Sequence, residues 1–212
     1  MKIAVYGAVG DVGKRVVAEA LGRGHEVSGI VRRQMQLDQL PDGVRGLVAD
    51  VCDSRQVVHT AKGQDLIISA VRPPQGREEM LVTMTRSILS CVDPRQRVLV
   101  VGGAARLRVP GHNGKTVLTL DGFLPASVVA IARACQAQYE VCLAETRAAW
   151  TYLSPPAMLI PGERIGSYRS GGDTLLVDAD GTSCISMEDY AVALLDEAES
   201  AKHVRRAFTV GY

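Results

Sequence analysis

The segment Met1–Leu21 constrains the fold more than any other part of the chain. It opens with the short apolar run Ile3–Tyr6, which is long enough for one buried strand. Glycines follow at three-residue spacing, and apolar residues then recur with helical spacing: Gly7, Gly10 and Gly13, then Val12, Val16, Val17, Ala20 and Leu21. A strand, a glycine turn and a helix in this order predict a site for the pyrophosphate of a dinucleotide. The glycines permit the tight turn, the close approach to phosphate and the close packing of helix on strand, while the helix N-terminus attracts the anion.

The end of the second predicted strand indicates which dinucleotide binds. Glu26–Val31 has the pattern of a strand and runs directly into Arg32 and Arg33, with no Asp or Glu at this strand end. An acidic residue here binds the ribose 2′-hydroxyl of NAD, whereas an arginine accommodates the 2′-phosphate of NADP. A guanidinium group also matches phosphate geometry and is always charged. The sequence therefore predicts NADP (NADPH) as the cofactor; the alternative is that both arginines are simply solvated in a loop.

The bulk properties are those of a globular domain. The chain has 212 residues, of which 47% are hydrophobic and 22% charged, and a net charge of +1. This charge gives no reason to expect binding to nucleic acid or to an acidic membrane surface. We expect no signal peptide, no membrane span and no metal site. The five cysteines lack ligand or disulfide spacing, which favours free thiols and a cytoplasmic location.

Predicted strands and helices alternate along the rest of the chain. The further strands are expected at Val44–Ala49, Asp65–Ala70, Arg97–Val101, Thr151–Leu153 and Ala207–Val210. The further helices are expected at Gln56–Ala61, Glu78–Cys91, Ala126–Ala148 and Ser186–Glu197, the last with Ser186 as N-cap and Asp189 three residues later. This alternation predicts a Rossmann-type α/β fold: a doubly wound parallel sheet with helices on both faces.

The segment 155–185 differs in composition from the rest of the chain. It is rich in glycine, with β-prone pieces around Tyr168 and at Leu175–Val177. We interpret it as a small C-terminal cap, so residues 1–212 form a single NAD(P)-binding domain.

Several motifs together resemble a known family. They are the glycine turn Gly7–Gly13, Val31–Arg33, Asp50, Val100–Ala104, Trp150–Pro155, Pro161–Arg169, Asp178–Gly181 and Ile185–Ala191. With them the chain resembles the atypical, NmrA-like branch of the short-chain dehydrogenase/reductase superfamily. The branch contains small NAD(P)H-binding proteins described as flavin or quinone reductases, and the tail is similar to that of one bacterial subgroup.

The resemblance implies a cofactor-binding set, position by position. Around the pyrophosphate it implies Gly7, Val9, Gly10, Asp11 and Val12, and at the 2′-phosphate Arg32 and Arg33. Beside the adenine and ribose it implies Asp50, Val51, Ala70, Val71 and Arg72, and near the nicotinamide Pro155 and Met158; Gly102 completes the cofactor-binding set.

The chain also departs from the family pattern. Val9 stands where many relatives have threonine, and Ala105–Arg106 replaces a Gly-Ser pair near the expected substrate. The Tyr-x-x-x-Lys pair of the superfamily is absent, because Leu143 stands four residues after Tyr139. A tyrosine without that lysine is a poor acid at neutral pH, so packing is the alternative role of Tyr139.

No residue stands out as catalytic. Arg72 and Arg106 are cations expected on loops at strand ends, where each either stabilises an anionic acceptor or is merely solvated. Ser154 ends the sixth strand, but Ser-Pro-Pro is also ordinary turn chemistry. His112 lies in a Gly-rich loop, and Tyr139 completes the candidates.

Hydride transfer is chemistry that the cofactor supplies. The leading hypothesis is therefore an NADPH-dependent oxidoreductase that reduces a small conjugated acceptor: a quinone, a flavin, or an enone or ketone. Two alternatives stay open. One is a redox sensor that binds NADP(H) without turnover, and the other is an enzyme recruited to specialised ketoreduction or cyclisation. We expect a monomer or homodimer and a small hydrophobic or aromatic substrate.

Two glycine- and proline-rich loops are expected to border this substrate, Gly102–Pro125 and Pro155–Gly172. They carry the apolar residues Leu107, Val109, Phe123, Met158, Leu159 and Ile160, which suit a flat acceptor. The alternative is that the loops only cover the sheet edge.

Overall fold

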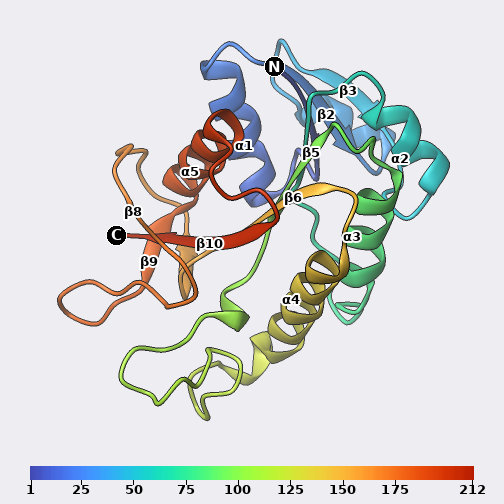
Figure 1. Cartoon of the computed structure of the whole chain (residues 1–212). Helices are drawn as coiled ribbons and strands as arrows, with labels where there is room; N and C mark the ends of the chain where they lie inside the picture. The colour runs from blue at the N-terminus through green and yellow to red at the C-terminus, as the bar shows by residue number, and fades with distance from the viewer.

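An eight-stranded, mostly parallel sheet forms the centre of the computed structural model, which describes residues 1–212 (Figure 1). Its strand order is β3-β2-β1-β4-β5-β6-β10-β8, and β8 alone runs antiparallel to its neighbour. The strands are β1 (Lys2–Tyr6), β2 (Glu26–Val31), β3 (Arg45–Val48), β4 (Leu66–Ser69), β5 (Arg97–Val101), β6 (Ala149–Ser154), β8 (Arg169–Gly171) and β10 (Arg206–Gly211). The chain runs outward from β1 to β3 and returns to β4, so the order reverses between β1 and β4. In open α/β sheets, ligands bind at the carboxyl ends of the strands at such a reversal.

Helices cover both faces of the sheet, as predicted (Figure 1). On one face lie α1 (Asp11–Gly22) and α5 (Met187–Ser200), and on the other α2 (Ser54–Ala61), α3 (Met80–Cys91) and α4 (Ala126–Ala144). Two short 3-10 helices follow strands: η1 (Gln34–Gln39) after β2 and η2 (Ala104–Arg106) after β5. The Rossmann-type fold class is confirmed.

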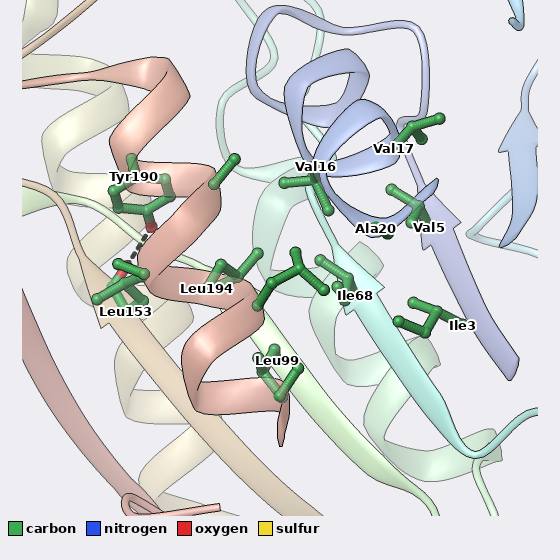
Figure 2. Packing of buried hydrophobic residues seen from close by; sticks show 14 of the residues in the cluster. Ile3, Val5, Val16, Val17, Ala20, Ile68, Leu99, Leu153, Tyr190 and Leu194 are labelled. Atoms are coloured by element: carbon green, nitrogen blue, oxygen red, sulfur yellow. Dashed lines mark hydrogen bonds between the residues drawn. The ribbon is translucent and has the colours of Figure 1, made fainter. Parts of the chain in front are cut away.

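Each central strand contributes to two cores. In β1, Ile3 and Val5 pack toward α1 and α5, while Ala4 and Tyr6 join the core beneath the helices of the opposite face. Figure 2 shows the first core, in which Val16 and Leu194 meet side chains of β4 and β5. The buried Tyr190 of α5 donates a hydrogen bond of 2.7 Å to the carbonyl of Leu153 (Figure 2). The first of these cores fixes α1, and with it the glycine turn, against the sheet.

The helix predicted through Ala148 is shorter in the structure. α4 ends at Ala144, because the Glu145 carboxylate accepts hydrogen bonds from the N–H groups of Arg147 and Ala148 and turns the chain. The next strand, β6, is correspondingly longer than the predicted Thr151–Leu153.

The glycine-rich segment is more closely joined to the sheet than predicted. The piece near Tyr168 becomes β8 and pairs with β10 as an edge strand. Leu175–Val177 forms no strand: the segment pairs with the loop after β5 through an isolated bridge between Thr174 and Arg108, and Leu175 is buried against that loop. A second, two-stranded parallel sheet of β7 (Met158–Ile160) and β9 (Cys184–Ser186) was not predicted, since each strand has only three residues.

The buried carboxylate of Asp189 connects this segment to α5. Ser186 caps α5 by accepting from the N–H of Asp189, as predicted. The Asp189 carboxylate, however, accepts from the N–H groups of Ile165 and Gly166 and from the Tyr212 hydroxyl. It therefore holds the loop after β7 in place.

None of the helices combines the length and the apolar character needed to cross a membrane. All five cysteines are free thiols, and no cluster of ligating side chains suits a metal ion.

Candidate functional site

A cavity of about 300 Å³ lies at the carboxyl ends of β1, β2 and β4, where the strand order reverses. Nine residues of the expected cofactor set line it: Gly7, Val9, Gly10, Arg32, Asp50, Val51, Ala70, Val71 and Arg72. Gln36 and Gln39 of η1 and Met80 and Met84 of α3 also line the cavity. The sequence analysis missed these four residues, because they lie in η1 and α3, outside the motifs that carry the family resemblance.

The glycine turn is shaped by contacts that exclude side chains. Gly7 has φ = +78°, and a Cβ there would lie 2.5 Å from the carbonyl oxygen of Ala70. The N–H of Gly10 closes the turn by donating to the Gly7 carbonyl at 2.9 Å. Gly10 is also the N-cap of α1 and provides no side-chain cap. The positive end of the helix dipole is thus left to an external anion, as a dinucleotide pyrophosphate requires.

The two arginines after β2 occupy different positions. Arg32 lines the cavity, whereas Arg33 is exposed, lies outside it and begins η1 with its N–H bonded to Gln36. No carboxylate stands at the end of β2. The nearest acidic lining residue is Asp50, which follows β3 and accepts a hydrogen bond from the N–H of Cys52 at 2.9 Å.

Five residues of the expected cofactor set lie outside the cavity besides Arg33. Asp11 and Val12 belong to the first turn of α1, where Asp11 is exposed and Val12 packs against the core. Gly102 comes directly after β5 and packs against Tyr152. A Cβ at this position would lie 2.2 Å from the aromatic ring. Pro155 is buried after β6, and Met158 is 45% exposed at the start of β7.

Arg106 is not a solvated loop residue, which excludes one of the two roles expected for it. Its side chain is 6% exposed. The guanidinium donates to the Ser154 hydroxyl at 3.0 Å, to the Asp173 carboxylate at 2.6 Å and to the Gly172 carbonyl at 3.1 Å. Three of its five N–H groups are engaged in this way and the side chain is nearly fully buried, so Arg106 connects η2, the end of β6 and the loop after β8.

The other catalytic candidates differ in accessibility. Ser154 is fully buried and accepts from Arg106. His112 is exposed in a turn of the loop after η2. Arg72 is exposed and makes neither an ion pair nor a hydrogen bond within the chain, although it lines the cavity. Tyr139 of α4 lies against Arg106, and burial raises the pKa of its phenol, an effect that nearby Arg106 opposes.

The loop after β5 is packed rather than open. Leu107 and Val109 form a small core with Val117 and Leu175, so they are not available to a flat acceptor as expected. Of the apolar residues expected at the acceptor, Met158 and Ile160 of β7 remain about half exposed.

Comparison with known proteins agrees with this geometry. The profile of a family described as NAD(P)H-binding matches residues 7–199. YwnB of Bacillus subtilis is 36% identical, with 99% of this chain and 98% of YwnB covered. A Streptococcus pneumoniae protein provisionally described as an NADH-flavin reductase is 28% identical, with a TM-score of 0.89 over 100% of this chain and 99% of that one. A Burkholderia pseudomallei protein provisionally described as exported is 35% identical, with a TM-score of 0.88 over the whole of both chains. The chain belongs to the NAD(P)H-binding family.

Proposed function

We propose that this protein is an NADPH-dependent reductase of a small conjugated acceptor. The observation that carries the cofactor preference is Arg32, which lines the cavity at the end of β2, where no carboxylate stands. An arginine at this position can bind the 2′-phosphate of NADP, whereas a carboxylate would repel that phosphate. Gln36 and Gln39 add neutral hydrogen-bonding groups to the same wall.

The residues present fit a dinucleotide. The turn at Gly7 leaves no room for a Cβ, and α1 begins without a side-chain cap. When bound, the reduced nicotinamide supplies a hydride. In this proposal the N-terminus of α1 would hold the phosphates, and η1, Asp50 and Ala70–Arg72 would hold the adenosine end.

A chemical argument and the name of one relative support this class of acceptor. A flavin or quinone takes up hydride readily, which suits a crevice without the usual Tyr-x-x-x-Lys pair. The Streptococcus relative described above carries the name of a flavin reductase. We place the acceptor beside β7, where Met158 and Ile160 offer apolar surface. We further propose that the enzyme is cytoplasmic, that it is a monomer or homodimer, and that its substrate is a small hydrophobic or aromatic molecule.

The test is NADPH and NADH consumption against a panel of quinones, flavins and cyclic enones and ketones, together with calorimetric binding of both cofactors. We expect turnover with at least one class and clearly tighter binding of NADPH. Equal affinity for the two cofactors would contradict the NADP preference. Tight NADPH binding without turnover on any acceptor would favour the redox-sensor alternative.

A further inference from the structure

A second cavity, of about 220 Å³, lies over the small sheet of β7 and β9. It shares no lining residue with the cavity that we assign to the cofactor. Its walls come from β7, the loop after β7, β9 and Tyr212, which follows β10. Because β7 and Tyr212 follow the carboxyl ends of the parallel strands β6 and β10, the second cavity lies at the same edge of the sheet as the first.

The two faces of the small sheet have different surroundings. Leu159 and Ile185 pack into the core beneath α1 and α5. Side chains alternate between the faces along a strand, so Met158 and Ile160 of β7 share the opposite face, together with Cys184, which pairs with Met158. Ile160 and Cys184 line the cavity. Met158 lies two residues along the strand from Ile160, a separation of about 7 Å.

The loop that forms one wall is held through its backbone. The N–H of Gly162 donates to the Glu188 carboxylate at 2.8 Å, and the carbonyl of Glu163 accepts from the Ser186 hydroxyl at 2.8 Å. The Asp189 carboxylate holds the following N–H groups, as described above. These bonds direct the polar backbone groups of the loop toward α5. The wall is therefore pre-formed, as the walls of ligand sites usually are.

The walls offer apolar surface and few polar groups to a ligand. Ile160 and Ile165 are exposed, and the hydroxyl of Tyr212 is engaged with Asp189 at 2.7 Å, which leaves the ring to contact a ligand. No lining residue is a cation, and the one charged lining residue is Glu163. An anionic group would be repelled by this carboxylate and would lose water without gaining a partner, whereas a neutral apolar group gains by leaving water.

The size of the cavity limits what it can hold. Sites for whole small molecules usually measure about 300–1,000 Å³, so a cavity of about 220 Å³ suits one part of a molecule. Met158 locates the other part, because we place the acceptor there and because Met158 and Ile160 share one face of β7. A ring that lies against Met158 can extend a substituent across Ile160 into the cavity.

We propose that the second cavity binds an alkyl substituent of the acceptor, and that the preferred acceptor is therefore an alkyl-substituted quinone. The proposal rests on the reductase function above and narrows its substrate class. An alkyl chain loses contact with water against Ile160, Ile165 and the ring of Tyr212. A flavin carries a hydroxylated or phosphorylated chain instead, which these apolar walls and the Glu163 carboxylate disfavour.

The test measures binding to the full chain loaded with NADP⁺. The probes are naphthoquinones that carry a methyl group and, at the adjacent ring position, an alkyl chain from methyl to octyl; with both positions substituted, the ring does not add a cysteine thiol. Burial of one methylene improves affinity by up to about fourfold. We expect Kd to fall by about two- to fourfold with each added methylene until the cavity is filled. A Kd that does not depend on chain length would overturn the proposal.

A charged wall should remove this dependence. Ile165→Lys places a charge at the cavity and keeps the backbone bond to Asp189, so the gain from the chain should be lost while Kd for the methyl compound stays within about twofold. The matched control is Val58→Lys, at an exposed position of α2 on the other face of the main sheet, which should keep the wild-type dependence. If both variants lose the gain equally, or neither does, the chain does not bind in this cavity.

Cys184 reports occupancy of the cavity without turnover. Its free thiol lines the cavity, whereas that of Cys91, at the end of α3, does not and serves as the internal control. The octyl compound at about ten times its Kd should slow alkylation of Cys184 by iodoacetamide about tenfold, since only the unoccupied fraction reacts, and should leave Cys91 unaffected. FMN should protect neither thiol.

The outcomes separate this proposal from the reductase function. If the octyl compound protects Cys184 but no quinone is reduced, the reductase function fails and the ligand site stands. If the octyl compound is reduced without protecting Cys184, or if FMN protects it as well, the alkyl site is refuted and the reductase function stands. Protection that grows with protein concentration alone would show that a second copy covers the cavity, which would also overturn the proposal.

Discussion

A Cβ at position 13 would lie 2.0 Å from the carbonyl oxygen of Gly7. This contact joins the first turn of α1 to the end of β1, and it leaves no room for any residue but glycine. Gly13→Ala must therefore separate the helix from the turn or distort both. We expect the free energy of unfolding to fall by about 1–3 kcal/mol, the usual cost of overpacking, and NADPH binding to weaken. Urea unfolding and calorimetry check both effects.

The same helix offers a matched control. Gly22 is the last residue of α1 and is exposed, and a Cβ there would meet no atom within 4 Å. Gly22→Ala should be neutral, or stabilising by up to about 1 kcal/mol, because alanine favours helix. If both substitutions destabilise the protein equally, the contact between Gly13 and Gly7 is not what limits position 13.

Arg32 is expected to decide between the two cofactors. Because it lines the cavity at the end of β2, Arg32→Ala should weaken NADPH binding by about 1.5–3 kcal/mol, the range for a hydrogen bond to a charged group. NADH lacks the 2′-phosphate and should bind almost as before. Arg86→Ala, on the exposed side of α3, is the control for loss of one positive charge. If Arg32→Ala weakens the binding of NADH and NADPH equally, Arg32 does not bind the 2′-phosphate.

Glu19 makes stability depend on pH. A hydrogen bond from Arg164, and then contacts with Arg23, outweigh burial and lower the pKa of Glu19 to about 2. A carboxylate whose pKa is lower in the folded state stabilises the protein above its unfolded pKa of about 4.3, and this contribution is lost as pH falls through about 2. Since Arg164 is 55% exposed and solvent screens the pair, we expect about 1–2 kcal/mol at neutral pH.

The measurement is urea unfolding of wild type and Glu19→Gln between pH 7 and pH 2.5. The difference in the free energy of unfolding should be constant near neutral pH and shrink below about pH 4.5. Glu26→Gln is the control, because Glu26 is exposed and lies 4.0 Å from Lys2. A difference that stays constant down to pH 2.5 would argue against the lowered pKa.

Ser186 should be the most sensitive cap in the chain. Its hydroxyl accepts from the N–H of Asp189 and donates to the Glu163 carbonyl. Ser186→Ala should cost about 1–2 kcal/mol, since loss of an N-cap alone costs about 1. Ser200→Ala, at the exposed C-terminal end of the same helix, should change the melting temperature little. Equal shifts in the two variants would show that the cap contributes nothing specific.

The sequence predicted the part of the site that depends on local spacing. The turn at Gly7 and the position of Arg32 after β2 follow from residues near in sequence, and the structure places both at one cavity. The environment of Arg106 was not predictable in this way. Its partners Ser154 and Asp173 lie 48 and 67 residues away, and no local pattern links them.

Short elements were missed for a related reason. β7 and β9 have three residues each, too few for an alternating pattern, and they form only because each pairs with the other. The predicted end of α4 failed because the Glu145 carboxylate binds two N–H groups ahead of it, a contact that outweighs the helix-forming tendency of the alanines around it. A substitution at Met158, the first residue of β7, tests whether this strand borders the acceptor.

Met158 is expected to separate acceptor binding from cofactor binding. It begins β7, is 45% exposed and lies outside the cavity that contains Arg32. A charge there would have to lose water when a flat apolar acceptor binds, which is unfavourable without a partner. Met158→Lys should therefore reduce kcat/KM for the acceptor by about tenfold or more, about 1.4 kcal/mol, while calorimetry shows nearly unchanged NADPH affinity. The control is Val204→Lys, since Val204 is 39% exposed just before β10, at the amino ends of the parallel strands and so away from the carboxyl ends where the cavity lies. If acceptor turnover survives in Met158→Lys, the acceptor does not bind beside β7.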